Sequence, residues 1–211
     1  MKLYEIYTSI QGETHLAGLP CTLVRFAACD LRCTYCDTEY AFTGGQEVSV
    51  DSIVADVGAR GVPLVLLTGG EPLLQRDLPA LCTALLTRKH EVMIETGGHR
   101  DVSVLPAGVV VILDVKTPGS GESSKMHWAN LERLGPRDAV KFVVTDEADY
   151  LWARDLIRDK RLDARCHVLL SPSFGKVDPK DLVTWMLRDQ LPARLNLQIH
   201  KYVWPPDQRG V

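Results

Sequence analysis

The chain alternates between short apolar runs and segments in which apolar residues recur with helical spacing. The apolar runs predict strands at Cys21–Ala27, Pro63–Leu67, Glu91–Ile94, Val109–Asp114, Ala139–Val144, Cys166–Leu170 and Arg194–Ile199. The helical spacing predicts helices at Val50–Arg60, Asp77–Lys89, Glu147–Lys160 and Asp178–Asp189. After Asp114 the pattern is weaker: residues 118–124 are rich in Gly and Ser, so only Lys125–Leu134 could be helical there.

Apolar strands separated by helices are typical of a parallel sheet that helices cover. Right-handed crossovers then leave two architectures, a doubly wound sheet or a full or partial (β/α) barrel, and six or seven βα steps fit either. The sequence has no internal repeat or linker, and the segment after Tyr202 is too rich in proline for a helix. We therefore expect a single α/β domain over residues 1–211.

Polar or otherwise unusual residues follow six of the seven predicted strands. They are Cys29, Thr68–Glu71, Glu95–Gly98, Asp114 with Lys116, Ser171 and His200. In parallel β/α folds, ligands bind at the carboxyl ends of the strands. Polar residues also follow strands because they cap the next helix, and this plainer interpretation applies to any one of them. As a set, they predict one binding mouth.

Composition narrows the class of protein. The 211 residues are 45% hydrophobic and 24% charged, with a formal net charge of −3, which is typical of a soluble globular domain. A net negative charge argues against nucleic acid as a partner. No apolar stretch is long enough for a membrane helix, and the first residues lack the apolar core of a signal peptide. We expect a cytoplasmic protein with reduced thiols.

Three of the six cysteines, Cys29, Cys33 and Cys36, lie within eight residues. Thiolates at this spacing suit zinc or an iron–sulfur cluster, and redox or packing thiols are a third interpretation. A structural zinc site requires a fourth ligand that the neighbouring sequence does not offer, whereas three thiolates on a four-iron cluster leave one iron open to a ligand. The other cysteines, Cys21, Cys82 and Cys166, lie in apolar runs, so we expect them to be buried packing residues.

The C-x3-C-x2-C spacing, with Tyr35 before the last cysteine, resembles the cluster loop of the radical S-adenosylmethionine superfamily. Thr68-Gly69-Gly70-Glu71-Pro72 resembles the glycine-rich segment of that superfamily. The resemblance implies a partial (β/α) barrel, a reduced core of about six parallel strands. It also implies a [4Fe-4S] cluster on the three cysteines, whose open iron binds S-adenosylmethionine.

A further set of motifs resembles the 7-carboxy-7-deazaguanine synthase family. They are Tyr7–Glu13, Arg25, Cys36-Asp37-Thr38 and Gln198–Tyr202. The resemblance implies a lyase that converts 6-carboxy-5,6,7,8-tetrahydropterin to 7-carboxy-7-deazaguanine with loss of ammonia, on the route to queuosine. It also implies a homodimer, magnesium, and an electron donor such as flavodoxin or ferredoxin.

The same resemblance assigns residues to the site. Substrate contacts are implied for Ile10, Gln11, Gly12, Glu13, Arg25, Thr68, Glu95 and His200. Cofactor contacts are implied for Tyr35, Gly70, Glu71, Asp114 and Lys116. Magnesium is implied at Thr38 through its hydroxyl. Plainer interpretations exist, since a strand arginine often pairs with a structural carboxylate, a threonine after aspartate is often a turn residue, and a histidine often caps or packs.

The chain departs from the family pattern at two strand ends. Asp114-Val115-Lys116 stands where some members have Ser-Pro-Lys, and Glu95-Thr96-Gly97-Gly98 replaces Glu-Thr-Asn-Gly.

Two other functions compete with the synthase. An activase that installs a glycyl radical on a protein shares the three-cysteine loop, and a non-catalytic module could hold zinc on the same cysteines.

Overall fold

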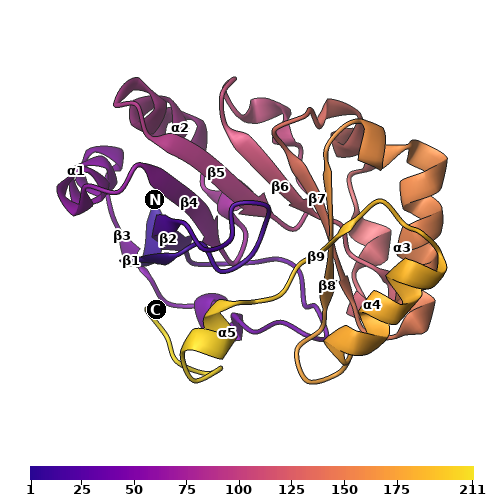
Figure 1. Ribbon diagram of the computed structural model, residues 1–211. Helices are drawn as coiled ribbons and strands as arrows, with labels where there is room; N and C mark the ends of the chain where they lie inside the picture. The colour runs from indigo at the N-terminus through magenta and orange to yellow at the C-terminus, as the bar shows by residue number, and fades with distance from the viewer.

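The computed structural model describes residues 1–211, whose strands form one nine-stranded sheet in the order β3-β1-β2-β4-β5-β6-β7-β8-β9 (Figure 1). The strands are β1 Lys2–Ile10, β2 Pro20–Phe26, β3 Gln46–Glu47, β4 Leu64–Gly69, β5 Glu91–Thr96, β6 Val110–Asp114, β7 Ala139–Val144, β8 His167–Pro172 and β9 Arg194–Leu195. The helices are α1 Val50–Arg60, α2 Leu78–Thr87, α3 Glu147–Lys160, α4 Pro179–Arg188 and α5 His200–Val203. Because β3 and β9 each pair with one neighbour only, the sheet is an open, partial barrel, as predicted.

From β2 to β9 every pair of neighbouring strands is parallel, which confirms the predicted βα core. The sequence prediction missed β1, which pairs antiparallel with β2, so the strand predicted as the first is the second. The reason is physical: most residues of β1 are only half-buried, so the strand carries no continuous apolar run.

The two faces of the sheet pack differently. One face carries the large core, in which α1, α2, α3 and α4 lie on residues such as Phe26, Leu67 and Phe142. Alternate strand residues point to the opposite, inner face, where they form a smaller core. Its members include Leu23, Leu66, Met93, Ile112, Ala139 and Leu169. No long helix covers this face. The residues that come after these core residues on the same strands are therefore free to line a cavity.

The helix boundaries follow local capping. Helices α1 and α3 have the predicted bounds, and α1 begins where Ser49 Oγ accepts a hydrogen bond from Ser52 N at 3.2 Å. Helix α1 ends at Gly61, which adopts the left-handed conformation with φ +68°. Helices α2 and α4 are one or two residues shorter than predicted at each end, because Asp77 and Asp178 are their N-caps.

The last predicted strand was wrong over most of its length. Strand β9 holds only two residues, and the chain then turns at Asn196, whose side chain donates to Ser171 Oγ and accepts from Thr14 N. His200 is therefore the first residue of α5 and does not follow a strand end. The possible α-helix at 125–134 is not formed. Two 3₁₀ helices, Ser123–Lys125 and Trp128–Arg133, take its place.

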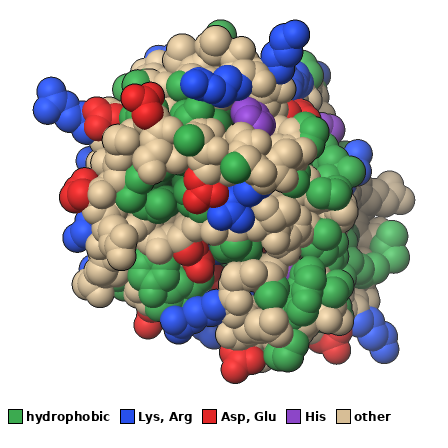
Figure 2. All heavy atoms as spheres, turned by 90° about the vertical axis from the view of Figure 1, so that its left-hand side faces the viewer, with side chains coloured by type: hydrophobic (Ala, Val, Ile, Leu, Met, Phe, Trp, Pro, Cys, Tyr) green, Lys and Arg blue, Asp and Glu red, His purple; other side chains and the backbone are tan.

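The surface is mixed in character. Figure 2 shows the face that carries β1, β3 and α1, where Lys, Arg, Asp and Glu side chains are scattered among hydrophobic ones without a region of one charge sign. None of the helices combines the length and the apolar character that crossing a bilayer requires.

Candidate active site

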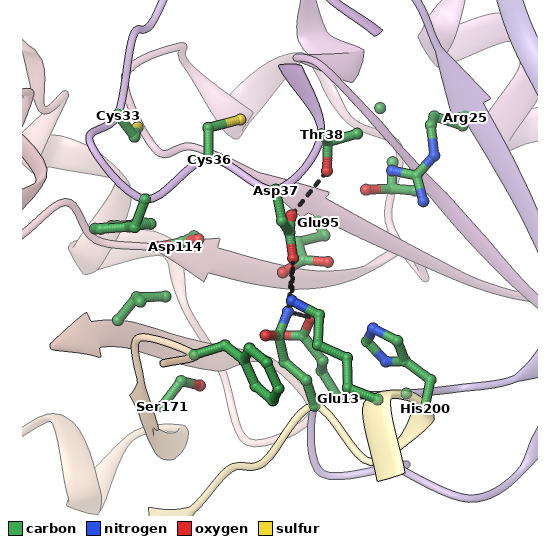
Figure 3. A pocket seen from close by; sticks show the side chains of 18 of the residues that line it. Glu13, Arg25, Cys33, Cys36, Asp37, Thr38, Glu95, Asp114, Ser171 and His200 are labelled. Carbon is green, nitrogen blue, oxygen red and sulfur yellow. Dashed lines mark hydrogen bonds and ion pairs between the residues drawn. The ribbon is translucent and has the colours of Figure 1, made fainter. Parts of the chain in front are cut away.

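A cavity of about 570 Å³ opens on the inner face, at the carboxyl ends of the parallel strands. Its walls come from the β1–β2 loop, the loop after β2, the strand ends and the segment after β9. Figure 3 shows Cys33 and Cys36 on one side of the cavity and Glu13 and His200 on the opposite side. The predicted mouth is therefore present, and every residue that the sequence analysis assigned to substrate or cofactor lines it.

One rule places the polar side chains of the strands. Each lies two residues after an inner-face apolar residue, so it points to the same face, one step nearer the cavity. The resulting row is Arg25, Thr68, Glu95, Asp114, Lys141 and Ser171. Arg25 pairs with Thr68 in the parallel register, and Asp114 pairs with Lys141. The fold thus gathers the row from six strands.

The three clustered thiols lie in the loop after β2, where Cys29, Cys33 and Cys36 are half-buried and form no disulfide. Burial raises the pKa of all three thiols, that of Cys33 to about 11. The loop is fixed by Thr34, whose N–H donates to Ser120 O at 3.0 Å and whose hydroxyl donates to Gly119 O at 2.8 Å.

The donor set of this loop fits an iron–sulfur cluster. Thiols are soft ligands, and the remaining cysteines are buried inside the core, so none supplies a fourth thiolate. No group of three or more His, Cys, Asp or Glu side chains lies close enough together to hold one metal ion. Three thiolates without a fourth protein ligand suit a four-iron cluster with one open iron better than a structural zinc ion, which takes four protein ligands.

The glycine-rich segment packs directly against the thiol loop. Gly70 N donates to Phe26 O at 3.0 Å, and Glu71 N donates to Ala28 O at 2.8 Å. A Cβ added at Gly70 would lie 2.1 Å from Ala28 O and 2.9 Å from Cys29 Cβ, so only glycine allows this approach. The loop and the segment thus form one cradle of backbone groups.

Glu71 has a structural role that its motif does not reveal. Its buried carboxylate accepts hydrogen bonds from Leu73 N at 3.0 Å, Thr96 Oγ1 at 2.8 Å and Gly97 N at 2.9 Å. Burial raises the pKa of Glu71, and these hydrogen bonds oppose the rise. The carboxylate therefore joins the glycine-rich segment to the end of β5.

Lys116, Asp114 and Tyr35 form a buried group beside the thiols. Lys116 Nζ lies 2.9 Å from Asp114 Oδ2 and 5.7 Å from the centre of the Tyr35 ring. Burial lowers the pKa of Lys116, but the surrounding acidic groups, Asp114 first among them, together outweigh it and the net shift is upward. The Tyr35 hydroxyl and Asp114 Oδ1 are buried without a hydrogen-bond partner. Such orphaned atoms are rare, and they fit a polar ligand that binds between them.

Lys141, which the sequence analysis missed, lies at the centre of the row. Its Nζ is 2.8 Å from Glu13 Oε2, makes a shorter contact to Glu95 Oε1, and lies 3.8 Å from Asp114 Oδ2. Burial lowers the pKa of Lys141, but the carboxylates outweigh it and hold the pKa well above its ordinary value. A lysine inside the apolar strand Ala139–Val144 is the signal that could have revealed it.

Arg25 is engaged by the protein as well as facing the cavity. Its Nε donates to Glu5 Oε1 at 2.8 Å, and its Nη2 donates to the Tyr7 hydroxyl at 3.3 Å. Glu5 and Tyr7 belong to β1, the strand that the sequence prediction missed. The plainer interpretation of Arg25, a pair with a structural carboxylate, is thus correct for Nε, while Nη1 donates no hydrogen bond within the protein.

Asp37 connects the thiol loop to the end of the chain. It accepts hydrogen bonds from the Thr38 hydroxyl at 2.9 Å, from Gln198 Nε2 at 2.9 Å and from Lys201 Nζ at 2.8 Å (Figure 3). Burial raises the pKa of Asp37, but the charge of Lys201 and the hydrogen bonds that Asp37 accepts together outweigh it, and the net shift is downward. Gln198 also donates to Glu13 Oε1 at 3.0 Å. These hydrogen bonds between the thiol loop and residues 198–201 were not predicted, and Thr38 takes part in them.

The β1–β2 loop supplies the other predicted substrate residues. Ile10 ends β1, and the Gln11 side chain is buried, where its Oε1 accepts from Glu13 N at 2.6 Å. A Cβ added at Gly12 would lie 2.1 Å from His200 Nδ1, so only a glycine at this position leaves room for the His200 imidazole. Burial lowers the pKa of His200, which favours the neutral ring.

The segment after α5 reaches the cavity. Residues 206–211 line it, and the Arg209 guanidinium lies 4.1 Å from the centre of the Tyr40 ring. This segment closes the side of the cavity that the sheet leaves open.

The chain is similar to proteins of known family. The model of the radical SAM superfamily matches residues 23–118. The 7-carboxy-7-deazaguanine synthase of Koribacter versatilis (strain Ellin345) is 45% identical over 226 residues, which cover 100% of both chains. That of Chlorobaculum tepidum is 44% identical over 214 residues, which cover 100% of this chain and 97% of the relative.

Solved structures agree on the fold. The crystal structure of QueE from Escherichia coli superposes with a TM-score of 0.77 at 21% identity, covering 93% of this chain and 92% of that one. SuiB of Streptococcus suis, bound to its precursor peptide SuiA, has a TM-score of 0.61 at 15% identity and covers 83% of this chain and 47% of its own. The full-length relatives decide between the competing interpretations. The chain belongs to the 7-carboxy-7-deazaguanine synthase family of the radical S-adenosylmethionine superfamily.

Proposed function

We propose that this chain converts 6-carboxy-5,6,7,8-tetrahydropterin to 7-carboxy-7-deazaguanine by a radical rearrangement that contracts the ring and releases ammonia. One observation carries the proposal. The thiol loop and a row of polar and charged side chains from six strands line the same cavity, so a cofactor and a polar heterocycle can bind side by side.

Membership of the superfamily implies a [4Fe-4S] cluster and S-adenosylmethionine. When bound, they supply a carbon radical that takes a hydrogen atom from the substrate. We assign the cluster to Cys29, Cys33 and Cys36, which are half-buried and free. The electron for each turnover comes from a donor such as flavodoxin or ferredoxin.

We assign S-adenosylmethionine to the cradle beside the thiols. Gly70 and Glu71 would line the cofactor, and Gly70 O, which accepts no hydrogen bond within the protein, would be the backbone group that this segment offers, since the N–H groups of both residues and the Glu71 carboxylate are already engaged. Lys116 would face its carboxylate, and the orphaned Tyr35 hydroxyl and Asp114 Oδ1 would gain partners. The absence of a Cβ at Gly70 lets the segment pack against Ala28 and Cys29, which keeps the cradle closed.

The substrate seat is the opposite side of the cavity. A pterin presents an edge of N–H donors, which the carboxylates of Glu13 and Glu95 can accept. Its own carboxylate suits the guanidinium of Arg25, whose Nη1 is free within the protein. The remaining contacts are assigned to Ile10, Gln11, Gly12, Thr68 and His200.

We place magnesium at Thr38. Magnesium prefers oxygen ligands and keeps several waters, so one hydroxyl with a substrate carboxylate is a sufficient set. The Thr38 hydroxyl donates to Asp37 Oδ1, so binding would turn its oxygen lone pair toward the ion while Asp37 stays beside it. The ion would help to orient the substrate and stabilise charge. The active form is proposed to be a homodimer, in keeping with the family.

Turnover under anaerobic conditions tests the proposal. The chain is reconstituted with iron and sulfide, reduced, and mixed with S-adenosylmethionine, magnesium and 6-carboxytetrahydropterin. The expected result is 7-carboxy-7-deazaguanine, identified by mass spectrometry, in amounts well above the enzyme concentration. Cleavage of S-adenosylmethionine without this product would point to a different substrate, and tight zinc retention without a visible cluster band would remove the radical chemistry.

A further inference from the structure

Lys141 is the one charged residue of the inner-face row to which neither the motifs nor the resemblance gave a role. We propose that Lys141 is a positioning residue that fixes Glu13 and Glu95 as a pair of ionised acceptors for the N–H edge of the pterin. The inference rests on the proposed function, because it names how the substrate side of that site recognises its ligand.

The geometry around Lys141 is that of a bridge. Its Nζ contacts Glu13 Oε2 at 2.8 Å and Glu95 Oε1 more closely, and these two carboxylates come from the β1–β2 loop and from β5. Lys141 itself is 4% exposed, so the bridge is sheltered from water. The second oxygen of Glu13 accepts from Gln198, whereas Glu95 Oε2 accepts no hydrogen bond from the protein. Glu95 Oε2 is therefore an acceptor left for a ligand in the cavity.

Electrostatics explains why the bridge must be a cation. Two partly buried carboxylates that share one partner resist ionising together unless a positive charge lies between them. Burial raises the pKa of both acids, and the Lys141 ammonium outweighs burial at Glu13 but not fully at Glu95. The other charged or titratable groups that face this trio are Asp114 with Lys116, Asp37 with Lys201, and His200. Asp114 and Asp37 are carboxylates, so they increase the need for Lys141.

The protonation state matters because the pterin edge consists of donors. An ionised carboxylate accepts from an N–H group, but a protonated carboxyl group presents an O–H donor of its own and loses acceptor capacity. If Lys141 is replaced by an uncharged residue, the Glu13 and Glu95 pair keeps a proton at neutral pH. Substrate binding is then weak at neutral pH and recovers as the pH rises and the proton leaves. In the unchanged enzyme Lys141 is proposed to hold the pair ionised, so we expect no such recovery.

The test compares K141M, K141R and unchanged holoenzyme between pH 6.5 and 9.5, with 6-carboxytetrahydropterin as the titrated ligand. For K141M we expect KM to rise about tenfold or more at pH 7, and to fall by up to about tenfold per pH unit above it. We expect kcat to change by less than about threefold, because Lys141 acts on binding. K141R restores the charge and is expected to restore a flat profile. Lys160→Met, at the exposed end of α3, is the matched control and should change neither parameter.

The outcomes separate the inference from the proposed function. If the unchanged enzyme forms no deazaguanine, the proposed function fails, whatever Lys141 does. If it does form product and K141M shows a KM profile parallel to that of the unchanged enzyme, the inference is overturned. K141Q provides the same test if K141M does not fold. Loss of folding in both variants would also overturn it, because Lys141 would then serve the stability of the sheet.

Discussion

The two sides of the cavity are built in opposite ways. On the cluster side, formed by residues 27–36 and 69–71 with Asp114 and Lys116, backbone contacts fix the chain and polar atoms are left without partners, including the Tyr35 hydroxyl. On the substrate side, ion pairs engage most of the charged groups, as Lys141 does with Glu13 and Glu95, and leave single atoms free, such as Glu95 Oε2 and Arg25 Nη1. The cluster side therefore offers atoms without any partner, whereas the substrate side offers single free atoms on groups that already belong to a charged network.

This difference predicts different responses to ligands. A cofactor on the cluster side gives partners to atoms that had none, so its binding displaces no protein hydrogen bond. A substrate on the other side binds groups that already hold charged partners, so only a ligand whose donors and charge match the remaining free atoms binds without disturbing that network. The cluster side sets whether chemistry can occur, and the substrate side sets which molecule undergoes it. Substitutions on the two sides should therefore differ in kind.

The largest effect is expected for Cys33→Ala. The variant loses one of three thiolates and has no neighbouring residue to replace it, so cluster binding and turnover should fall to background. Iron and sulfide content, the visible absorption spectrum and deazaguanine formation measure this. The matched control is Cys82→Ala, which removes a sulfur buried in the helix-covered core and should leave the iron content unchanged. Equal loss of iron in both variants would contradict the assignment.

The next largest effect is expected where the glycine-rich segment packs closely against the thiol loop. Gly70→Ala places a Cβ 2.1 Å from Ala28 O, so the segment must move, at a cost of about 1–3 kcal/mol in unfolding free energy. We also expect weaker S-adenosylmethionine binding. Gly58→Ala in α1 meets no atom within 4 Å and should instead stabilise the protein by about 0.5–1 kcal/mol. Denaturant unfolding and calorimetry compare the two, and effects of the same sign would show that the cradle is loose.

The same contrast explains what the sequence could predict. The cluster side is local in the chain, since Cys29, Cys33 and Cys36 share one loop and Gly70 lies in a short motif, so spacing alone revealed it. The core of the sheet followed from continuous apolar runs, and β7 and α3 were predicted residue for residue. These features depend on neighbours in the sequence, which periodicity and capping describe well.

The substrate side depends on residues far apart in the chain. Gln198 and Glu13 are separated by 185 positions and Lys141 and Glu13 by 128, and no local pattern encodes either pairing. The role of Arg25 was open for the same reason, because its partner Glu5 lies on β1, a strand without an apolar run. Asn196 ended β9 early through tertiary hydrogen bonds, a competition that strand propensity does not include.

A smaller effect is expected for Thr38→Ala, which lies where the two sides meet. The exposed hydroxyl bonds only to Asp37, so thermal stability should change little. If the hydroxyl binds magnesium, stimulation by the ion should disappear and turnover fall by about tenfold, equivalent to about 1.4 kcal/mol. Thr38→Ser keeps the oxygen and should keep both. Turnover is measured against magnesium concentration, and full activity of T38A with an unchanged magnesium dependence would remove the role.

The smallest effect should come from the segment that closes the cavity. Arg209 stacks over the Tyr40 ring with its guanidinium 4.1 Å from the ring centre, and Tyr40 in turn lies 3.4 Å from Glu5, the partner of Arg25. A cation–π contact at an exposed site contributes about 0.5–1 kcal/mol, so Arg209→Ala should raise KM by about two- to fivefold and leave the cluster spectrum unchanged. Arg209→Lys should recover part of the loss. A KM increase above about a hundredfold would instead place Arg209 among the residues that bind the substrate carboxylate, because only a direct charge pair lost from the site has that magnitude.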